Sequence, residues 1–211
     1  MIRLISGMLA VAVIISVSSP PVSAQGITGG LKTGLNHANF RGETIGLTKS
    51  RVGFTAGGFV TFRINETFSI QPEVYYTVKG FRQKVRGAFE STITLDYLEI
   101  PVLAKYSSET QNNVKISLFA GPAFEFNLKS KTNIKPEGGI EEEKDLDTKG
   151  FDYGLVLGLE VSIDVYYCKI IIESRYTLGL MIINKDWRNN PGGEDFEVKN
   201  SVLSLLVGFS F

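Results

Sequence analysis

Apolar side chains recur at every second position over most of the chain, in segments separated by turn-forming residues. The last segment, SVLSLLVGFSF, shows the pattern clearly, because an apolar or aromatic residue occupies every second position from Leu203 to Phe211. Strict alternation indicates a strand with one apolar face and one polar face. The pattern predicts eight strands. They cover residues 26–39, 51–64, 67–79, 93–106, 114–128, 151–162, 168–181 and 199–211.

The connections between these segments alternate in length. Those after the second, fourth and sixth segments are short, as in the two residues NE at 65–66. The other connections are longer and cover 40–50, 80–92, 129–150 and 182–198. An even strand number, with short turns at one end and long loops at the other, is typical of outer-membrane barrels. The sequence therefore predicts an all-β, eight-stranded antiparallel up-and-down transmembrane β-barrel with both termini on the periplasmic side.

The charged residues separate the two faces of the predicted strands. One face of the segment 114–128 carries no charge from Val114 to Leu128. The same holds for one face of the segments 26–39, 51–64, 67–79, 151–162, 168–181 and 199–211. A Lys or Arg at the middle of a bilayer would cost about 2–4 kcal/mol, which explains a charge-free face that contacts lipid. The alternative is a soluble lipocalin-like barrel that turns this face inward and carries an apolar ligand.

The polar face predicts a cluster of charges inside the barrel. Pairing neighbouring strands about their loops places Glu73, Glu99 and Glu125 in one inward-facing row, with Asp152 beside it. Adjacent carboxylates repel one another and need cations or retained protons. The expected partners are Lys32 and Arg175. Because eight strands leave interior room only for side chains, the cluster is expected to be a salt-bridged plug. A cation or proton path along it is the alternative.

Three prolines interrupt the predicted strands. Strand pairing places Pro72 opposite roughly 101, and Pro101 opposite roughly 122. Since proline cannot donate to a strand ladder, we expect a shared bulge or bend along this row. The alternation of apolar and polar residues also shifts by one position near Asp96 and Tyr97, which predicts a further bulge there.

The N-terminus has the pattern of a secretory signal. Arg3 precedes an apolar run from Leu4 to Val17, and a small-residue cleavage site ends at Ala24. An uncleaved anchor is the alternative. We therefore expect a signal peptide over 1–24 and one barrel domain over 25–211. The single cysteine, Cys168, rules out an intrachain disulfide, and a formal net charge of zero argues against a nucleic-acid surface.

A catalytic site in this chain would depend on its only histidine. His37 and Ser201 lie near the outer ends of strands that barrel closure makes neighbours, and Glu43 is the nearest orienting acid. A Ser–His pair needs hydrogen-bond reach, which nothing in the sequence fixes. We therefore expect no catalytic, cofactor or metal site. The acidic stretch 137–147 matches no defined calcium loop, and Trp187 marks either a contact surface or a rim packing residue.

Several longer stretches resemble one family. They are GLKTGLNHANF ending at Phe40, QPEVYYTVKG at 71–80, LDYLEIPVLAKY at 95–106, LFAGPAFEF at 118–126 and the terminal GFSF. Together they resemble the PorT-type outer-membrane β-barrel proteins of two-membrane bacteria, over nearly the whole mature chain. The resemblance implies an eight-stranded barrel, insertion by the barrel assembly machinery with Phe211 as its signal, and no shared catalytic residues.

The sequence thus predicts an outer-membrane protein that is not an enzyme. We expect it to act through its long extracellular loops or as a structural component of the membrane. The expected partners are outer-membrane lipid, the assembly machinery and a protein at the extracellular loops. An accessory role in protein export, as in PorT-like proteins, is the second hypothesis.

Overall fold

The computed structural model of the chain describes residues 26–41, 48–85, 89–110, 113–136, 142–145, 150–180 and 199–211. The predicted signal peptide over 1–24 lies outside these ranges, as do Glu43 and Trp187. Within the described residues, no helix is long and apolar enough to cross a membrane.

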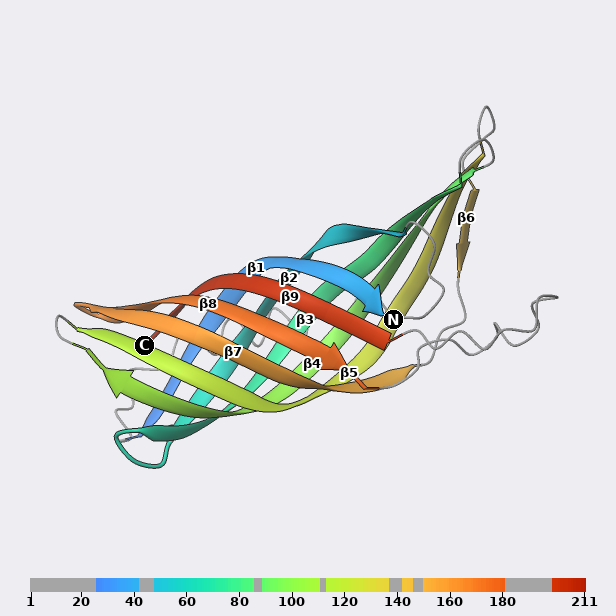
Figure 1. Ribbon diagram of the computed structural model, residues 1–211. Helices are drawn as coiled ribbons and strands as arrows, with labels where there is room; N and C mark the ends of the chain where they lie inside the picture. Colours follow the sequence, from blue (N-terminus) through green and yellow to red (C-terminus); the bar gives the residue numbers. More distant parts are fainter. Residues whose placement is uncertain are drawn as a thin grey trace, which may run out of the picture.

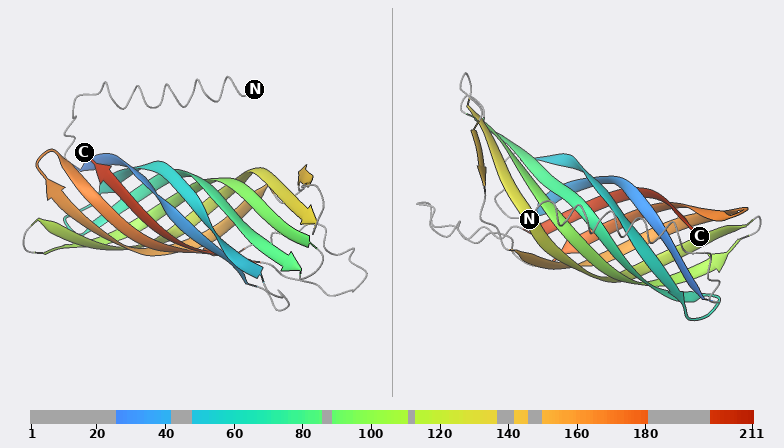
Figure 2. Two further views of the ribbon diagram at one scale, coloured as in Figure 1. Left: turned by 90° about the horizontal axis from the view of Figure 1, so that it is seen from above. Right: turned by 180° about the vertical axis from the view of Figure 1, so that it is seen from behind.

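The described chain forms one closed antiparallel barrel (Figures 1 and 2). Its strands are β1 (Ile27–Arg41), β2 (Thr48–Arg63), β3 (Phe68–Val85), β4 (Phe89–Glu109), β5 (Val114–Pro136), β6 (Glu142–Asp145), β7 (Phe151–Val165), β8 (Cys168–Gly179) and β9 (Lys199–Ser210). Each strand of the wall pairs with its neighbour in sequence, and β1 pairs with β9 to close the ring. The short β6 adds to β5 outside the ring. The eight-stranded barrel predicted from the sequence is therefore confirmed.

The short turns and the C-terminus lie at one end of the barrel, at the left of Figure 1. The strand ends that the longer connections join, and β6, lie at the other end. Since outer-membrane barrels carry short turns on the periplasmic side, we call these the periplasmic end and the extracellular end.

Three strands extend well beyond their predicted ends on the extracellular side. The segment 80–92 was expected to be a loop, but β3 continues to Val85 and β4 begins at Phe89. The segment 129–150 was also expected to be a loop, but β5 continues to Pro136 and β6 pairs with it. The physical reason is that apolar alternation reports contact with lipid. It stops where the membrane stops, whereas backbone pairing continues.

The apolar face points outward and the charged face points inward. Leu118, Leu157 and Leu205 are about half exposed on the outer surface, whereas Lys32 and Glu73 are almost fully buried. A soluble carrier needs the opposite arrangement, so the lipocalin-like alternative is excluded. One predicted outward position differs, because the Ser201 side chain is buried.

Exposed aromatic residues gather at both ends of the outer face. Near the extracellular end they are Tyr76, Phe126, Phe151 and Tyr153. Near the periplasmic end they are Phe62, Phe68, Tyr106, Phe209 and Phe211. Pairs of these rings touch, with 5.3 Å between the centroids of Phe126 and Phe151. Two aromatic belts are the expected anchors at the two membrane interfaces.

The proline row is staggered by one position from its predicted pairing. Pro72 pairs with Val102, and Pro101 pairs with Ala123. The β3–β4 ladder has a gap after Pro72, and the β4–β5 ladder has a gap after Pro101, as expected where a donor is missing. The bulge predicted near Asp96 and Tyr97 is confirmed by a register shift at that point.

Candidate functional site

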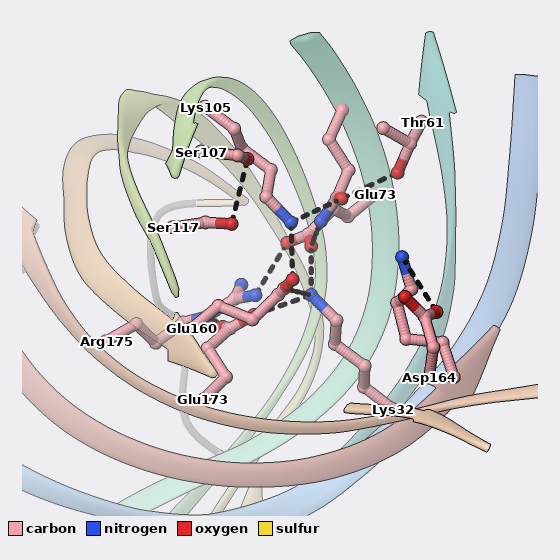
Figure 3. A network of polar contacts seen from close by, with 12 residues as sticks. Lys32, Thr61, Glu73, Lys105, Ser107, Ser117, Glu160, Asp164, Glu173 and Arg175 are labelled. Carbon is pink, nitrogen blue, oxygen red and sulfur yellow. Dashed lines mark hydrogen bonds and ion pairs between the residues drawn. The ribbon is translucent and has the colours of Figure 1, made fainter. Parts of the chain in front are cut away.

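A single lysine lies at the centre of the lumen. The Nζ of Lys32 on β1 donates to Glu73 on β3 at 3.2 Å, to Glu160 on β7 at 3.0 Å and to Glu173 on β8 at 2.5 Å. Figure 3 shows these carboxylates converging on the ammonium group. The lysine side chain reaches the centre because β1 presents every second residue inward, and Lys32 is almost fully buried.

An arginine holds two of the same carboxylates from another side. The Nη2 of Arg175 on β8 lies 2.7 Å from Glu73 Oε2, and its Nε donates to Glu173. Nη2 also donates to the hydroxyl of Tyr75 at 3.3 Å, and the guanidinium lies 4.9 Å from the centroid of that ring. The arginine is therefore fixed by charge, hydrogen bonding and ring contact together.

A second lysine completes this group at its periplasmic side. The Nζ of Lys105 donates to Glu160 at 2.8 Å and to Gln71 at 2.9 Å. We call the six charged residues the lower network: Lys32, Glu73, Lys105, Glu160, Glu173 and Arg175. Its cations and carboxylates balance three to three. Buried ions need such pairing, because each loses its hydration on burial.

Glycines make room for the large side chains beside this network. A Cβ atom at Gly158 would overlap the ring of Phe119, and one at Gly30 would overlap the ring of Phe59. The ammonium of Lys32 in turn lies 4.5 Å from the centroid of the Phe59 ring. These two glycines thus allow aromatic rings to approach the backbone of the inner wall closely and to contact the ions.

A separate group of charges occupies the lumen nearer the extracellular end. The Nζ of Lys79 on β3 lies 2.7 Å from Glu125 Oε2 and 3.9 Å from Glu99 Oε2. Thr77 donates its hydroxyl to Glu99 at 2.9 Å. Glu125 pairs in register with Glu99 on one side and with Asp152 on the other. We call Lys79, Glu99, Glu125 and Asp152 the upper network.

In the upper network, Glu125 has a buried carboxylate oxygen without a hydrogen bond. Among the described residues, Glu125 Oε1 has no hydrogen-bond partner, whereas Oε2 is bonded to Lys79. Within the same ranges, no three His, Cys, Asp or Glu side chains are grouped so that they could hold a metal ion.

The predicted charge cluster is therefore divided between two networks. Lys32, Glu73 and Arg175 meet in the lower one, and Glu99, Glu125 and Asp152 lie in the upper one. Glu73 is separated from the row because Tyr75 lies opposite Glu99. Lys32 and Arg175, the expected partners of the whole row, both contact Glu73, whereas Lys79 is the cation beside Glu99 and Glu125.

Four further charged members of the two networks occupy inward-facing positions in the alternation of the chain. They are Lys79, Lys105, Glu160 and Glu173. Their position in the alternation of apolar and polar residues indicates that they face the lumen. It gives the face of a strand but not which side chains meet across the lumen.

The candidate catalytic residues His37 and Ser201 do not form a pair. In the β1–β9 ladder His37 lies opposite Leu203, and Ser201 lies opposite Asn39. The Ser201 hydroxyl is instead 2.7 Å from the hydroxyl of Tyr176. Phe211, the expected assembly signal, has a side chain that is 63% exposed at the periplasmic end.

Comparison with known proteins identifies one family and several similar folds. Residues 23–184 match the family model described as outer membrane protein beta-barrel domain. No curated protein matches the chain.

Three solved structures illustrate the likeness. A major outer membrane protein of Thermus thermophilus is 11% identical, with a TM-score of 0.52 and coverage of 89% of this chain and 100% of that one. OprG of Pseudomonas aeruginosa is 14% identical, with a TM-score of 0.50 and coverage of 88% and 94%. Neisserial surface protein A is 18% identical, with a TM-score of 0.49 and coverage of 88% and 98%. The chain is thus an outer-membrane protein and belongs to the outer membrane protein β-barrel domain family.

Proposed function

We propose that this protein is a surface-interaction component of the outer membrane, with a lumen closed by side chains. The lower network supports a closed lumen, because its ion pairs cross the barrel, as Arg175 on β8 does to reach Glu73 on β3. A pore would need that space open, and an eight-stranded barrel has little interior beyond its side chains. The proposal therefore assigns the activity to the surfaces outside the membrane rather than to transport or catalysis.

The observation that carries the proposal is the sheet beyond the extracellular aromatic belt. The β3–β4 ladder runs unbroken from Tyr75 to the pair of Val85 with Phe89, and β5 follows β4 up to Pro136. From the belt residue Phe126, the strand β5 thus continues for roughly 30 Å along its own direction. Figures 1 and 2 show these strands and β6 projecting past the rest of the barrel. A sheet of this length is not needed to cross the membrane.

The extension also offers a strand edge. Among the described residues, β6 is the last strand of the sheet, paired to β5 on one side only. An exposed edge can accept an extended segment of another protein by adding a strand, with main-chain hydrogen bonds supplying affinity. The partner class that fits this geometry is therefore a protein with an extended segment, outside the cell.

Two expectations from the family resemblance belong to this proposal. The barrel assembly machinery would recognise Phe211, and the lipid contacts of the outer face would follow insertion. A PorT-like accessory role in export would instead require a protein partner on the periplasmic side. The two hypotheses differ in which end of the barrel contacts the partner.

Site-specific photocrosslinking in living cells separates the two hypotheses. A photoreactive amino acid placed at Lys129 or Asn133 probes the extension, and the same amino acid at Tyr167 probes the periplasmic turn. Both ends are accessible, since Lys129 and Tyr167 are exposed. Unboiled samples that migrate faster on a detergent gel verify that each variant is folded.

We expect crosslinks to one macromolecule at Lys129 and Asn133 and none to it at Tyr167. Replacing residues 81–93 and 130–149 by short turns, which removes the extension, should abolish the crosslink from Lys129. Crosslinks confined to Tyr167 and secretion components would overturn the surface role and support the export role.

A further inference from the structure

The outer wall of the barrel has a hollow on its periplasmic half, which we call the outer hollow. It has a volume of about 450 Å³ and is lined by residues of β3, β4, β5 and β7, which are neighbours in the wall. Ala104 and Ala120 form its floor, because they face each other in the β4–β5 ladder and are both exposed. The extracellular extension lies at the other end of the barrel, so the function proposed above does not use the hollow.

Larger side chains surround this floor. Phe68 and Tyr106 lie at its periplasmic side, and their rings meet edge to face with 5.3 Å between the centroids. Leu118 lies two residues before Ala120 on the same face of β5, and Leu157 on β7 lies opposite Ala120 in the ladder. All four of these larger side chains are about half exposed on the outer surface. The hollow therefore exists because two methyl groups lie among long side chains.

The residues that line the hollow offer no charge to an occupant. Lys105 and Phe119 border it, but both side chains are buried. The Nζ of Lys105 is bonded to Glu160 and Gln71 inside the lumen, so its charge belongs to the lower network. Apart from the Tyr106 hydroxyl, the exposed side chains of the lining are apolar. Water finds no partners in such a space, so the occupant that fits it is apolar.

The position of the hollow in the membrane names the apolar molecule. Phe68 and Tyr106 belong to the periplasmic aromatic belt, which marks the membrane interface, and Leu157 lies near the middle of β7. The hollow therefore extends from that interface toward the middle of the bilayer, within the periplasmic leaflet. It is continuous with the lipid-facing wall, so a molecule enters it sideways from the membrane. The apolar molecules of that leaflet are the acyl chains of phospholipids.

The size of the hollow fits an acyl chain. A cavity needs roughly 10–15 Å³ to admit one water-sized group, so about 450 Å³ takes a chain of many methylene groups rather than a single methyl group. A chain in the hollow contacts the floor and the surrounding side chains together, whereas a chain on the convex wall has protein on one side only. Dispersion attraction sums over these contacts, so the chain in the hollow is held more firmly than its neighbours.

A second copy of the chain fits the hollow less well. In a two-fold dimer the same surface patch of each copy meets the other, so the outer hollow of one copy would face that of its partner. The two alanine floors would then be separated by empty space. Such a void loses dispersion contacts, which a flexible acyl chain recovers.

We infer that the outer hollow binds one acyl chain of a phospholipid from the periplasmic leaflet, with Ala104 and Ala120 beneath the chain and the Phe68–Tyr106 pair at the end nearer the headgroup. The wall thus holds one lipid at a discrete site, in contrast with the exchangeable lipid around the rest of the barrel. The two alanines are the test positions, because leucine at both fills the hollow and keeps the surface apolar.

The test uses the full-length protein folded in octyl glucoside micelles that contain dipalmitoyl phosphatidylethanolamine. Gel filtration into lipid-free octyl glucoside removes exchangeable lipid, and native mass spectrometry counts the phospholipids that remain on each protein. The variant Ala104→Leu/Ala120→Leu fills the hollow. Thr33→Leu/Ala56→Leu is the matched control, because these two residues also face outward and lie opposite each other, in the β1–β2 ladder. Each variant must show the folded mobility on an unboiled gel.

We expect the wild-type protein and the control variant to retain one phospholipid, and the filled variant to retain at least tenfold less. Equal retention in the two double variants, whether high or low, would overturn the site. A wild-type dimer that carries no lipid and is lost in the filled variant would assign the hollow to a second copy, which would also overturn the proposal.

Discussion

The Nζ of Lys32 on β1 lies 3.0 Å from Oε2 of Glu160 on β7, although β9 and β8 stand between these strands in the barrel wall. The contact therefore crosses the lumen. The same ammonium meets Glu73 on β3, beyond β2 on its other side. One side chain thus joins distant parts of the ring, which makes the interior a connected network rather than a channel.

Replacing Lys32 with Met should destabilise the barrel strongly. The substitution leaves carboxylates of the lower network buried with too few cations, and breaking a buried ion pair in this way costs about 3–5 kcal/mol. Urea unfolding in lipid vesicles, followed by tryptophan fluorescence and gel mobility, measures the loss. Lys129→Met at an exposed position is the matched control and should change the free energy of unfolding by less than about 0.5 kcal/mol. Equal unfolding midpoints for the two variants would contradict the central role of Lys32.

Removing a carboxylate from the upper network should destabilise the barrel less than removing its lysine. Glu99 and Glu125 lie directly opposite each other and share Lys79. Changing Glu125 to Gln leaves Lys79 with Glu99 and relieves repulsion between adjacent carboxylates, so we expect a cost below about 1 kcal/mol. Changing Lys79 to Met leaves both carboxylates without their cation and should cost about 3 kcal/mol or more. The same unfolding experiment ranks the two variants, and the reverse order would exclude a shared lysine.

Two glycines of the wall offer a matched comparison of the inner and outer faces. A Cβ atom at Gly34 would lie 2.7 Å from the Cα of Leu206, a backbone atom that cannot turn aside. At Gly58 the added Cβ atom would lie 3.3 Å from a methyl group of Leu31, and this side chain can rotate away. We expect Gly34→Ala to cost about 1–3 kcal/mol and Gly58→Ala to be nearly neutral. Similar unfolding free energies for both variants would show that the backbone around Gly34 can shift to accommodate a methyl group.

Alternation along the chain was sufficient to predict the fold and the face of most residues. It gave the eight strands, the lumen side of Lys32 and Glu73, and the bulge near Asp96, because each depends on local parity. The alternation alone does not identify which side chains contact one another across the lumen. These contacts depend on strand tilt and stagger in the closed barrel, and on side-chain length, which is why Lys79 was missed as the partner of Glu125.

The alternation also fails to predict structure where a strand no longer contacts lipid on one face. The residues of β3, β4 and β5 beyond the membrane are strands without a lipid-facing pattern, so they were expected to be loops. At the start of β9, Ser201 and Val202 are both buried, and the serine turns to Tyr176 rather than outward. In each case backbone or side-chain hydrogen bonds determine the structure, and the apolar periodicity of the sequence does not predict them.

The lipid-facing surface should show a depth-dependent penalty for charge. Leu157 and Ile163 lie on the same strand and the same face, the first near its middle and the second near the periplasmic turn. Leu157→Arg should cost about 2–4 kcal/mol and Ile163→Arg about 0–1 kcal/mol. Unfolding in lipid vesicles measures both, with the wild-type protein as reference. Equal penalties would place the centre of the bilayer elsewhere on the barrel.

The single cysteine tests the orientation of the barrel in the membrane. Cys168 is exposed next to the short turn between β7 and β8, so it should face the periplasm. A bulky PEG-maleimide that does not cross the outer membrane should leave it unmodified in intact cells and modify it after permeabilisation. The variant Lys129→Cys/Cys168→Ser moves the thiol to the extension and should react in intact cells. Because both thiols are exposed, a difference between them reports the side of the membrane rather than burial. The opposite labelling pattern would place the extension in the periplasm, and the proposed surface role would then fail.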